Sequence, residues 1–321
     1  MPPPVPSPMT AIVDSIARNS NGYRVARICA CILLSVAAGF AGQPDTISAY
    51  PNPAEMVRKA VHNELKAADD DTARFLFRGT KTTPKGSTTR LYVETRDATA
   101  GLVIAYNGKT LTPAQQKDEE ARVRRFIDNP DELNKKREQE RSNAEHTMRI
   151  VRALPDAFLF EYAGEEPASE GIGRSGSSLV KLKFRPNPSY EPPSRVEEVL
   201  SGMQGYVLVD PIRYRLASID GTLFKEVGFG WGILGHLDRG SRFVVRQQEA
   251  GDNFWEVSEM TLSFTGKILL FKNLSIISTE TFSGFKRVSA DLTFAQAVEL
   301  LKKEEGLEAE NSPDSKLAHP Q

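Results

Sequence analysis

Residues 241–264 read SRFVVRQQEAGDNFWEVSEMTLSF, and this stretch decides the fold class. Apolar and polar residues alternate on both sides of Gly251-Asp252, a pair of residue types that favours a tight turn. Two alternating runs joined by a turn predict an antiparallel hairpin in which each strand buries one face. The stretch therefore indicates a β-rich protein.

The same alternation continues on both sides of this hairpin. From Gly205 to Val288 we expect strands at 206–209, 214–219, 222–229, 241–248, 255–264, 268–277 and 281–288. We expect turns between them at Asp220-Gly221, Arg239-Gly240, Gly251-Asp252 and Thr265-Gly266-Lys267. Short strands at such regular spacing are typical of a sandwich, a barrel or a curled sheet.

An earlier group of strands predicts a three-stranded antiparallel meander. It ends at Tyr106, with one turn at Pro84-Lys85-Gly86 and a tight turn at Asn107-Gly108. Such a meander is too small to hold a core alone, so it needs the later strands. Two further strands are expected at 157–162 and 179–184, and we predict a single β-rich domain over 53–303.

Helical patterns interrupt the strands. We expect an amphipathic helix at 53–67, a charged helical hairpin at 112–154 broken near Asn129-Pro130, a short helix at 194–200 and a last helix at 292–303. The polar tail at 304–321 is expected to be disordered. The predicted class is mainly β (α+β). Its predicted form is an antiparallel curved sheet or unclosed barrel with an N-terminal helix and an inserted helical hairpin.

The N-terminus has the layout of a secretory signal peptide. Arg24 and Arg27 precede an apolar run at 28–41, ICACILLSVAAGFA, which ends in small residues before Gly42. The run is shorter than the about 20 residues that span a bilayer. We expect residues 1–41 to be removed on export and 42–52 to form a linker; an uncleaved anchor is the alternative. The mature protein would then be periplasmic or extracellular, with no stable membrane span and no cysteine.

Charge argues against one class of partner. The formal net charge is −1, so no bulk basicity favours nucleic acid. The dense mixed charges at 112–152 predict a solvated helix surface, and docking of an envelope protein on these helices is the alternative.

Two short motifs near residue 235 are candidate sites. The stretch 230–235, GWGILG, matches GxGxxG, but a dinucleotide site needs a helix to follow, and here a strand follows. We therefore predict no cofactor and regard Trp231 as a loop anchor. HExxH and GxSxG are absent, so we predict no catalytic and no metal site. His236, two residues before Asp238, is read as a structural or surface histidine, or with Asp238 as part of an unrecognised hydrolase.

The sequence feature that does suggest a function is its pattern of apolar and aromatic residues. Many phenylalanines stand at alternate positions of predicted strands. Either they form a packed core, or they line a partly open apolar cavity that binds an acyl chain. The candidate cavity residues are Phe75, Phe77, Leu91, Val93, Phe158, Phe160, Phe243 and Phe264.

Three blocks carry a resemblance to known proteins. GTLFKEVGFGWGILGHLDRGSRF (221–243), GKILLFKNLSI (266–276) and YNGKTLTPAQQ (106–116) resemble uncharacterised exported bacterial proteins. The order of helix, meander, helical insertion and further strands is similar to that of periplasmic lipoprotein-localisation factors. That second resemblance implies an unclosed barrel around helices that carries acyl chains, but the long charged insertion departs from that family.

These observations predict a non-enzymatic periplasmic binding or carrier protein for an apolar ligand, such as a lipid or the acyl part of a lipoprotein. An envelope protein–protein interaction module with a fully packed core is the first alternative. It would dock through the charged helices or the Trp231 hairpin. The unrecognised hydrolase is the second.

Overall fold

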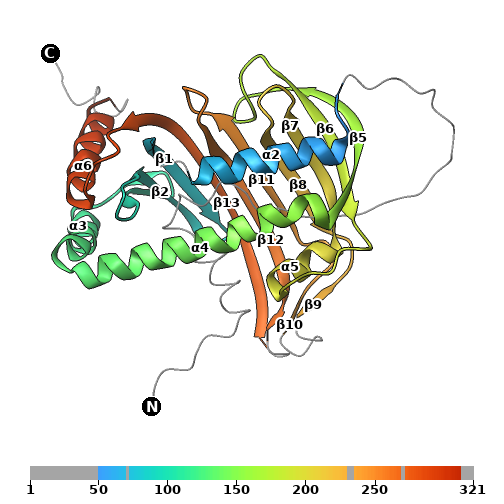
Figure 1. Ribbon diagram of the computed structural model, residues 1–321. Coiled ribbons are helices and arrows are strands. Elements are labelled where there is room, and N and C mark those ends of the chain that lie inside the picture. The colour runs from blue at the N-terminus through green and yellow to red at the C-terminus, as the bar shows by residue number, and fades with distance from the viewer. Residues whose placement is uncertain (1–49, 70–71, 230–234, 269–271, 312–321) are drawn as a thin grey trace. The chain divides into compact units, whose positions relative to one another are not determined.

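The computed structural model describes residues 50–69, 72–229, 235–268 and 272–311, and antiparallel strands dominate it (Figure 1). The described chain falls into two compact units. The first holds residues 50–69 and 145–279, and the second holds residues 72–144 and 280–311. Each unit is described by itself below. The predicted signal peptide (1–41) and most of the predicted linker lie outside the described residues.

The second unit contains the predicted meander. Its strands are β1 (Arg74–Thr83), β2 (Gly86–Val93), β3 (Ala100–Tyr106), β4 (Lys109–Thr110) and the C-terminal part of β13 (Lys272–Val288), in the order β4-β3-β2-β1-β13. The tight turn is confirmed, because Asn107 and Gly108 have φ angles of 50° and 72°. Positive φ at both central residues is what a two-residue hairpin turn of type I′ requires.

Two helices cover one face of this meander. Helix α6 (Phe294–Asn311) packs against β2 and β3, and helix α3 (Pro113–Asp128) packs against β3 and α6. The buried residues between them form a core in which Val123 and the α6 residues Phe294, Val298 and Leu301 meet the strands. Helix α6 continues to Asn311, past the predicted end at Lys303, because Glu, Leu and Ala in the added turns favour helix. Residues 312–321 of the predicted disordered tail lie outside the described residues.

The predicted helical hairpin is confirmed. Helix α3 ends at Asp128 with Asn129 as its C-cap, and helix α4 (Pro130–Ala157) begins with the proline that follows. Thr112 caps α3 reciprocally: its hydroxyl accepts from the Gln115 N–H, and the Gln115 side chain accepts from the Thr112 N–H.

Buried charges of this hairpin complete the edge of strand β3. The Val103 N–H donates to Glu119 at 2.7 Å, and the Thr99 N–H donates to Glu140 at 3.0 Å. Between them, the Gly101 carbonyl accepts from Arg122 at 2.7 Å. Outside its short pairing with β4, the edge of β3 would present these backbone groups unpaired if the helix side chains were absent. Unpaired groups at a sheet edge are a template for aggregation. These members of the charged stretch therefore pair with the backbone at the edge of the sheet, whereas the charge pattern of the stretch predicts a solvated helix surface.

The first unit contains most of the remaining strands. They are β5 (Phe158–Pro167), β6 (Ser178–Pro186), β7 (Met203–Asp210), β8 (Arg215–Leu223), β9 (Val227–Phe229), β10 (Gly235–Leu237), β11 (Arg242–Glu249) and β12 (Trp255–Ile268). The order is β13-β12-β11-β8-β7-β6-β5, and the short β9–β10 hairpin pairs with β12. Because β13 continues through both units, the 13 described strands form one antiparallel sheet that does not close. The predicted mainly β, unclosed architecture is confirmed.

Two predicted turns in this unit are wrong. Asp220-Gly221 lies inside β8, where Gly221 pairs with Gly205 of β7 and Phe243 of β11. Thr265-Gly266-Lys267 lies inside β12, where Gly266 pairs with Leu237. In both places glycine permits the close approach of a neighbouring strand, since an added Cβ would lie 2.0 Å from the Asp220 carbonyl at Gly205 and 2.1 Å from the His236 carbonyl at Gly266. The two strands predicted at 268–277 and 281–288 are accordingly one strand, β13.

Helix α2 (Pro53–Ala68) lies against β5, β7 and β8 in the first unit (Figure 1). Asn52 caps it by accepting from the Ala54 N–H at 2.9 Å, and Pro53 occupies the first helical position, as predicted. Met56, Val57, Ala60 and Val61 form its buried stripe. The short predicted helix near 194–200 is α5 (Arg195–Glu198) followed by the 3₁₀ turn η2 (Val199–Gly202). Among the described helices, none combines the length and the apolar character needed to cross a membrane.

Candidate functional site

Aromatic side chains gather on one face of the β2-β1-β13 part of the second unit. The Phe77 ring stacks on Tyr92 with centroids 5.2 Å apart, and it contacts Phe285 at 5.4 Å and Phe282 at 6.1 Å. Phe75 meets Phe285 edge to face at 6.3 Å. Four of these five rings are buried, and Phe285 is half-buried. We call Phe75, Phe77, Tyr92, Phe282 and Phe285 the aromatic face.

Leu91 and Val93, predicted to join Phe75 and Phe77, point to the opposite side of the sheet. Register pairs Phe77 with Tyr92 and Leu76 with Val93, so adjacent pairs alternate between faces. Leu91 and Val93 accordingly belong to the core under α6. These four predicted residues are therefore divided between the aliphatic face, which helices cover, and the aromatic face.

The other four predicted apolar residues lie in the first unit, in two places. Phe158 and Phe160 contact Phe184 of β6, with ring centroids 4.7 and 6.3 Å apart. Phe243 and Phe264 contact each other at 6.4 Å across β11 and β12. Phe160 is half-buried, and the other three rings are buried.

A small cavity in the second unit has both polar and apolar residues in its lining. Tyr92, Thr99 and Arg122 contribute to its lining, and its volume is about 10 Å³, enough for one water molecule at most. The Thr99 hydroxyl has no hydrogen-bond partner among the described residues, so it offers such a water one contact. The cavity is far too small for an acyl chain.

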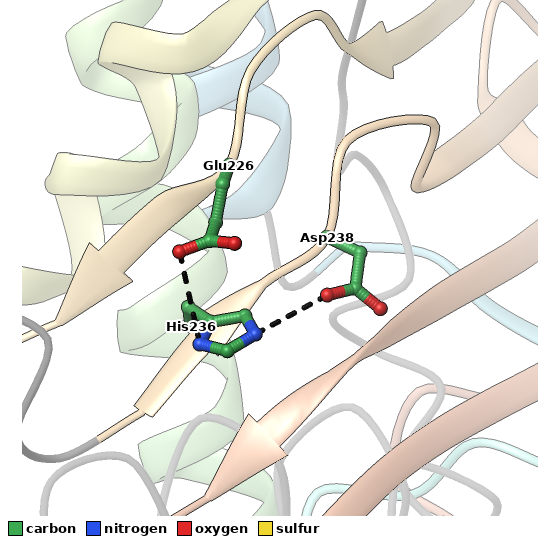
Figure 2. Close-up of side chains that lie close together, drawn as sticks. All are labelled: Glu226, His236 and Asp238. Atoms are coloured by element: carbon green, nitrogen blue, oxygen red, sulfur yellow. Dashed lines mark ion pairs between the residues drawn. The ribbon is translucent and has the colours of Figure 1, made fainter. Parts of the chain in front are cut away.

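A histidine between two carboxylates forms a second candidate site, in the first unit (Figure 2). The His236 Nε2 atom lies 3.3 Å from an Asp238 oxygen, and its Nδ1 atom lies 3.8 Å from a Glu226 oxygen. The imidazole is 22% exposed, whereas the carboxylates are 44% and 62% exposed for Asp238 and Glu226. The hydrolase alternative requires His236 and Asp238 to converge, and they do.

Backbone pairing brings these three residues together. In β10, His236 pairs with Gly228 of β9 on one side and with Lys267 of β12 on the other. Glu226 immediately precedes β9, and the Asp238 N–H donates to the Thr265 carbonyl at 2.8 Å just after β10. Hairpin pairing thus places Glu226 beside a histidine ten positions later in the chain.

The sequence pattern identifies His236 and Asp238 as candidates but does not identify Glu226. Its only signal was a hairpin pattern on both sides of the glycine-rich stretch, and the register of that hairpin was not predictable from the spacing. Trp231, the predicted loop anchor, and most of the GxGxxG stretch lie outside the described residues.

Comparison with known proteins finds likeness in architecture alone. No protein-family model matches the sequence, and no curated protein matches it. A crystal structure of an outer membrane lipoprotein-sorting protein domain from Vibrio parahaemolyticus is 11% identical, with a TM-score of 0.27, over 77% of this chain and 99% of its own. A DUF1329 family protein from Desulfovibrio piger is also 11% identical, with a TM-score of 0.27, over 78% of this chain and 100% of its own.

Proposed function

We propose that the protein is an exported, non-enzymatic binding or carrier protein for an apolar ligand, a lipid or the acyl chain of a lipoprotein. The observation that carries this proposal is the aromatic face. Helix α6 packs against the aliphatic side of β2 and β3, and α3 packs beside it on β3, while five aromatic rings gather on the other side of β2, β1 and β13. The export signal predicted from the sequence supports the envelope as the site of action.

The free energy gained by burying an acyl chain on this face is large enough for reversible binding. Burying a methylene group stabilises a complex by about 0.8 kcal/mol, so ten methylenes contribute roughly 8 kcal/mol before ordering costs are subtracted. That value corresponds to affinity of about micromolar strength, which suits a reversible carrier. Because the rings are buried, loading requires them to separate from their present neighbours, and the half-buried Phe285 is the ring that needs the least rearrangement.

Native mass spectrometry of the mature protein isolated from the envelope, with lipid extraction, tests the proposal. We expect a stoichiometric lipid adduct that delipidation removes and that identifies the ligand class. A measured mass equal to that of the protein alone, together with no uptake of lipid from vesicles, would overturn the carrier proposal. It would favour the interaction module instead, whose packed core is consistent with the low exposure of most of the rings.

Two alanine variants of half-buried phenylalanines separate ligand binding from stability. Phe285 lies on the aromatic face, whereas Phe126 packs on Phe294 at 6.0 Å on the aliphatic side. We expect Phe285→Ala to reduce lipid occupancy roughly 10-fold and Phe126→Ala to leave it unchanged. Equal losses in both variants would mean that folding, and not contact with lipid, controls occupancy.

A further inference from the structure

We propose that Glu226, His236 and Asp238 bind a divalent transition-metal ion of the Zn²⁺ class, a site independent of the apolar-ligand proposal. One ligand atom from each of the three residues lies within 4.8 Å of the others. One imidazole nitrogen and two carboxylates are a ligand set that suits Zn²⁺ and its first-row neighbours. Three protein ligands leave a coordination position for water.

The spacing between His236 and Asp238 already matches a coordination sphere. Zinc–nitrogen and zinc–oxygen bonds are about 2.0–2.2 Å long, so two ligands at a tetrahedral angle stand roughly 3.3 Å apart. The His236 Nε2 atom and the Asp238 oxygen are separated by 3.3 Å. The ion would therefore lie between these two atoms.

Glu226 supplies the third ligand by a change of side-chain rotamer. Its carboxylate now faces the Nδ1 atom at 3.8 Å, on the other side of the imidazole from Asp238. A metal ion bonds to only one imidazole nitrogen at a time, so Glu226 must turn toward the Nε2 side. Its 62% exposure makes this turn inexpensive, because few contacts are lost.

The backbone under the other two ligands is held on both sides. Strand β10 is paired with β9 and with β12, and both backbone groups of Asp238 are engaged, the N–H with Thr265 and the carbonyl with the Ser241 N–H. Fixed ligands lose little entropy on binding an ion. Two carboxylates and a neutral imidazole carry a net negative charge, which favours a cation. The exposed Lys267, opposite His236, opposes it only weakly, because solvent and salt screen its charge.

Two titrations of the metal-free mature protein test the site. One uses Zn²⁺ and is monitored by calorimetry, and the other uses Co²⁺ and is monitored by visible absorption. We expect one ion per chain and a Co²⁺ spectrum typical of a site with nitrogen and oxygen ligands. His236→Ala and Glu226→Gln should each weaken binding at least about 10-fold, since even the loss of an outer-shell partner has that effect. His62→Ala, which removes an exposed histidine of α2, should bind as the parent does.

Thermal unfolding supplies a second readout. Zn²⁺ should raise the Tm of the parent and of His62→Ala by mass action and leave that of His236→Ala unchanged. The metal-free variants should melt as the parent does, because the substituted side chains are partly exposed. Zn²⁺ binding that is absent in the parent, or that His236→Ala retains at full strength, would overturn the proposal.

Discussion

Arg215 of β8 donates two hydrogen bonds to Glu64 of α2, from Nε to Oε1 at 2.7 Å and from Nη2 to Oε2 at 2.9 Å. The Leu216 N–H also donates to Glu64, at 3.0 Å. The guanidinium lies over the Trp255 ring, 5.5 Å from its centroid, and the Glu64 side chain is fully buried. This bidentate pair joins the N-terminal helix to the sheet of the first unit.

Removing Arg215 should therefore be costly. Arg215→Met leaves the Glu64 carboxylate buried without its charged partner, and breaking a buried pair in this way costs about 3–5 kcal/mol. Urea unfolding of the variant would measure the loss in the free energy of unfolding.

Arg242→Met is the matched control for this experiment. Arg242 makes the same bidentate contact with Asp220, but their side chains are 53% and 40% exposed. We expect a cost of about 1 kcal/mol or less, because water solvates the remaining carboxylate. Equal losses in the free energy of unfolding for the two variants would show that burial does not decide the strength of these ion pairs.

Glu119→Ala should open the edge of β3. The substitution leaves the buried Val103 N–H and the Arg122 guanidinium without their carboxylate partner, and an unsatisfied buried donor costs about 1–3 kcal/mol. Hydrogen exchange at the Val103 amide should accelerate, and the variant should aggregate more readily through the exposed edge. Glu120→Ala changes an exposed neighbour on the same helix and should alter neither measurement.

Alanine should have opposite effects at two glycines. At Gly205 the added Cβ would stand 2.0 Å from the Asp220 carbonyl oxygen, so β7 and β8 must separate, at a cost of at least about 1–3 kcal/mol. At Gly306, within α6, an added Cβ would meet no described atom within 4 Å apart from the helix's own backbone, and alanine should stabilise the helix by about 0.5–1 kcal/mol. Chemical denaturation of both variants checks the two signs, and a stabilised Gly205→Ala would show that the strand contact yields easily.

The titration of Tyr50 gives a prediction for alkaline pH. Its hydroxyl donates to Glu165 at 3.0 Å, and this hydrogen bond raises the pKa of Tyr50 above its ordinary value of 10.0. A raised pKa means that the folded state holds the proton more tightly than the unfolded state does. The resulting stabilisation is complete below the unfolded pKa and disappears as the pH rises through the folded pKa.

Tyrosinate absorbance during an alkaline titration measures this pKa. Glu165→Gln should return one phenol toward its ordinary value, and Tyr50→Phe should remove that phenol from the titration curve. A curve unchanged by Glu165→Gln would show that the hydrogen bond to Glu165 is not what holds the proton.

Local patterns were enough to predict most elements of the fold. Alternation marked the strands of the meander, and Asn107-Gly108 marked a turn that only residues tolerant of positive φ form easily. Proline at the first position marked α2, α3 and α4. The turn predicted at Asp220-Gly221 is wrong, because an Asp-Gly pair inside a strand has the same composition as an Asp-Gly pair in a turn between two strands. What distinguishes them is the neighbouring strand, here β7, which approaches closely at Gly205.

The sequence by itself determined the class of the fold, an antiparallel sheet with an N-terminal helix and an inserted helical hairpin, because side-chain period and turn chemistry are local properties. Only the tertiary structure decided which residues meet. Register placed Leu91 and Val93 on the face opposite Phe75 and Phe77, and it placed Glu226 beside His236. A shift of one residue would reverse the faces of the β1–β2 pair, so pairing between strands decides the composition of both candidate sites.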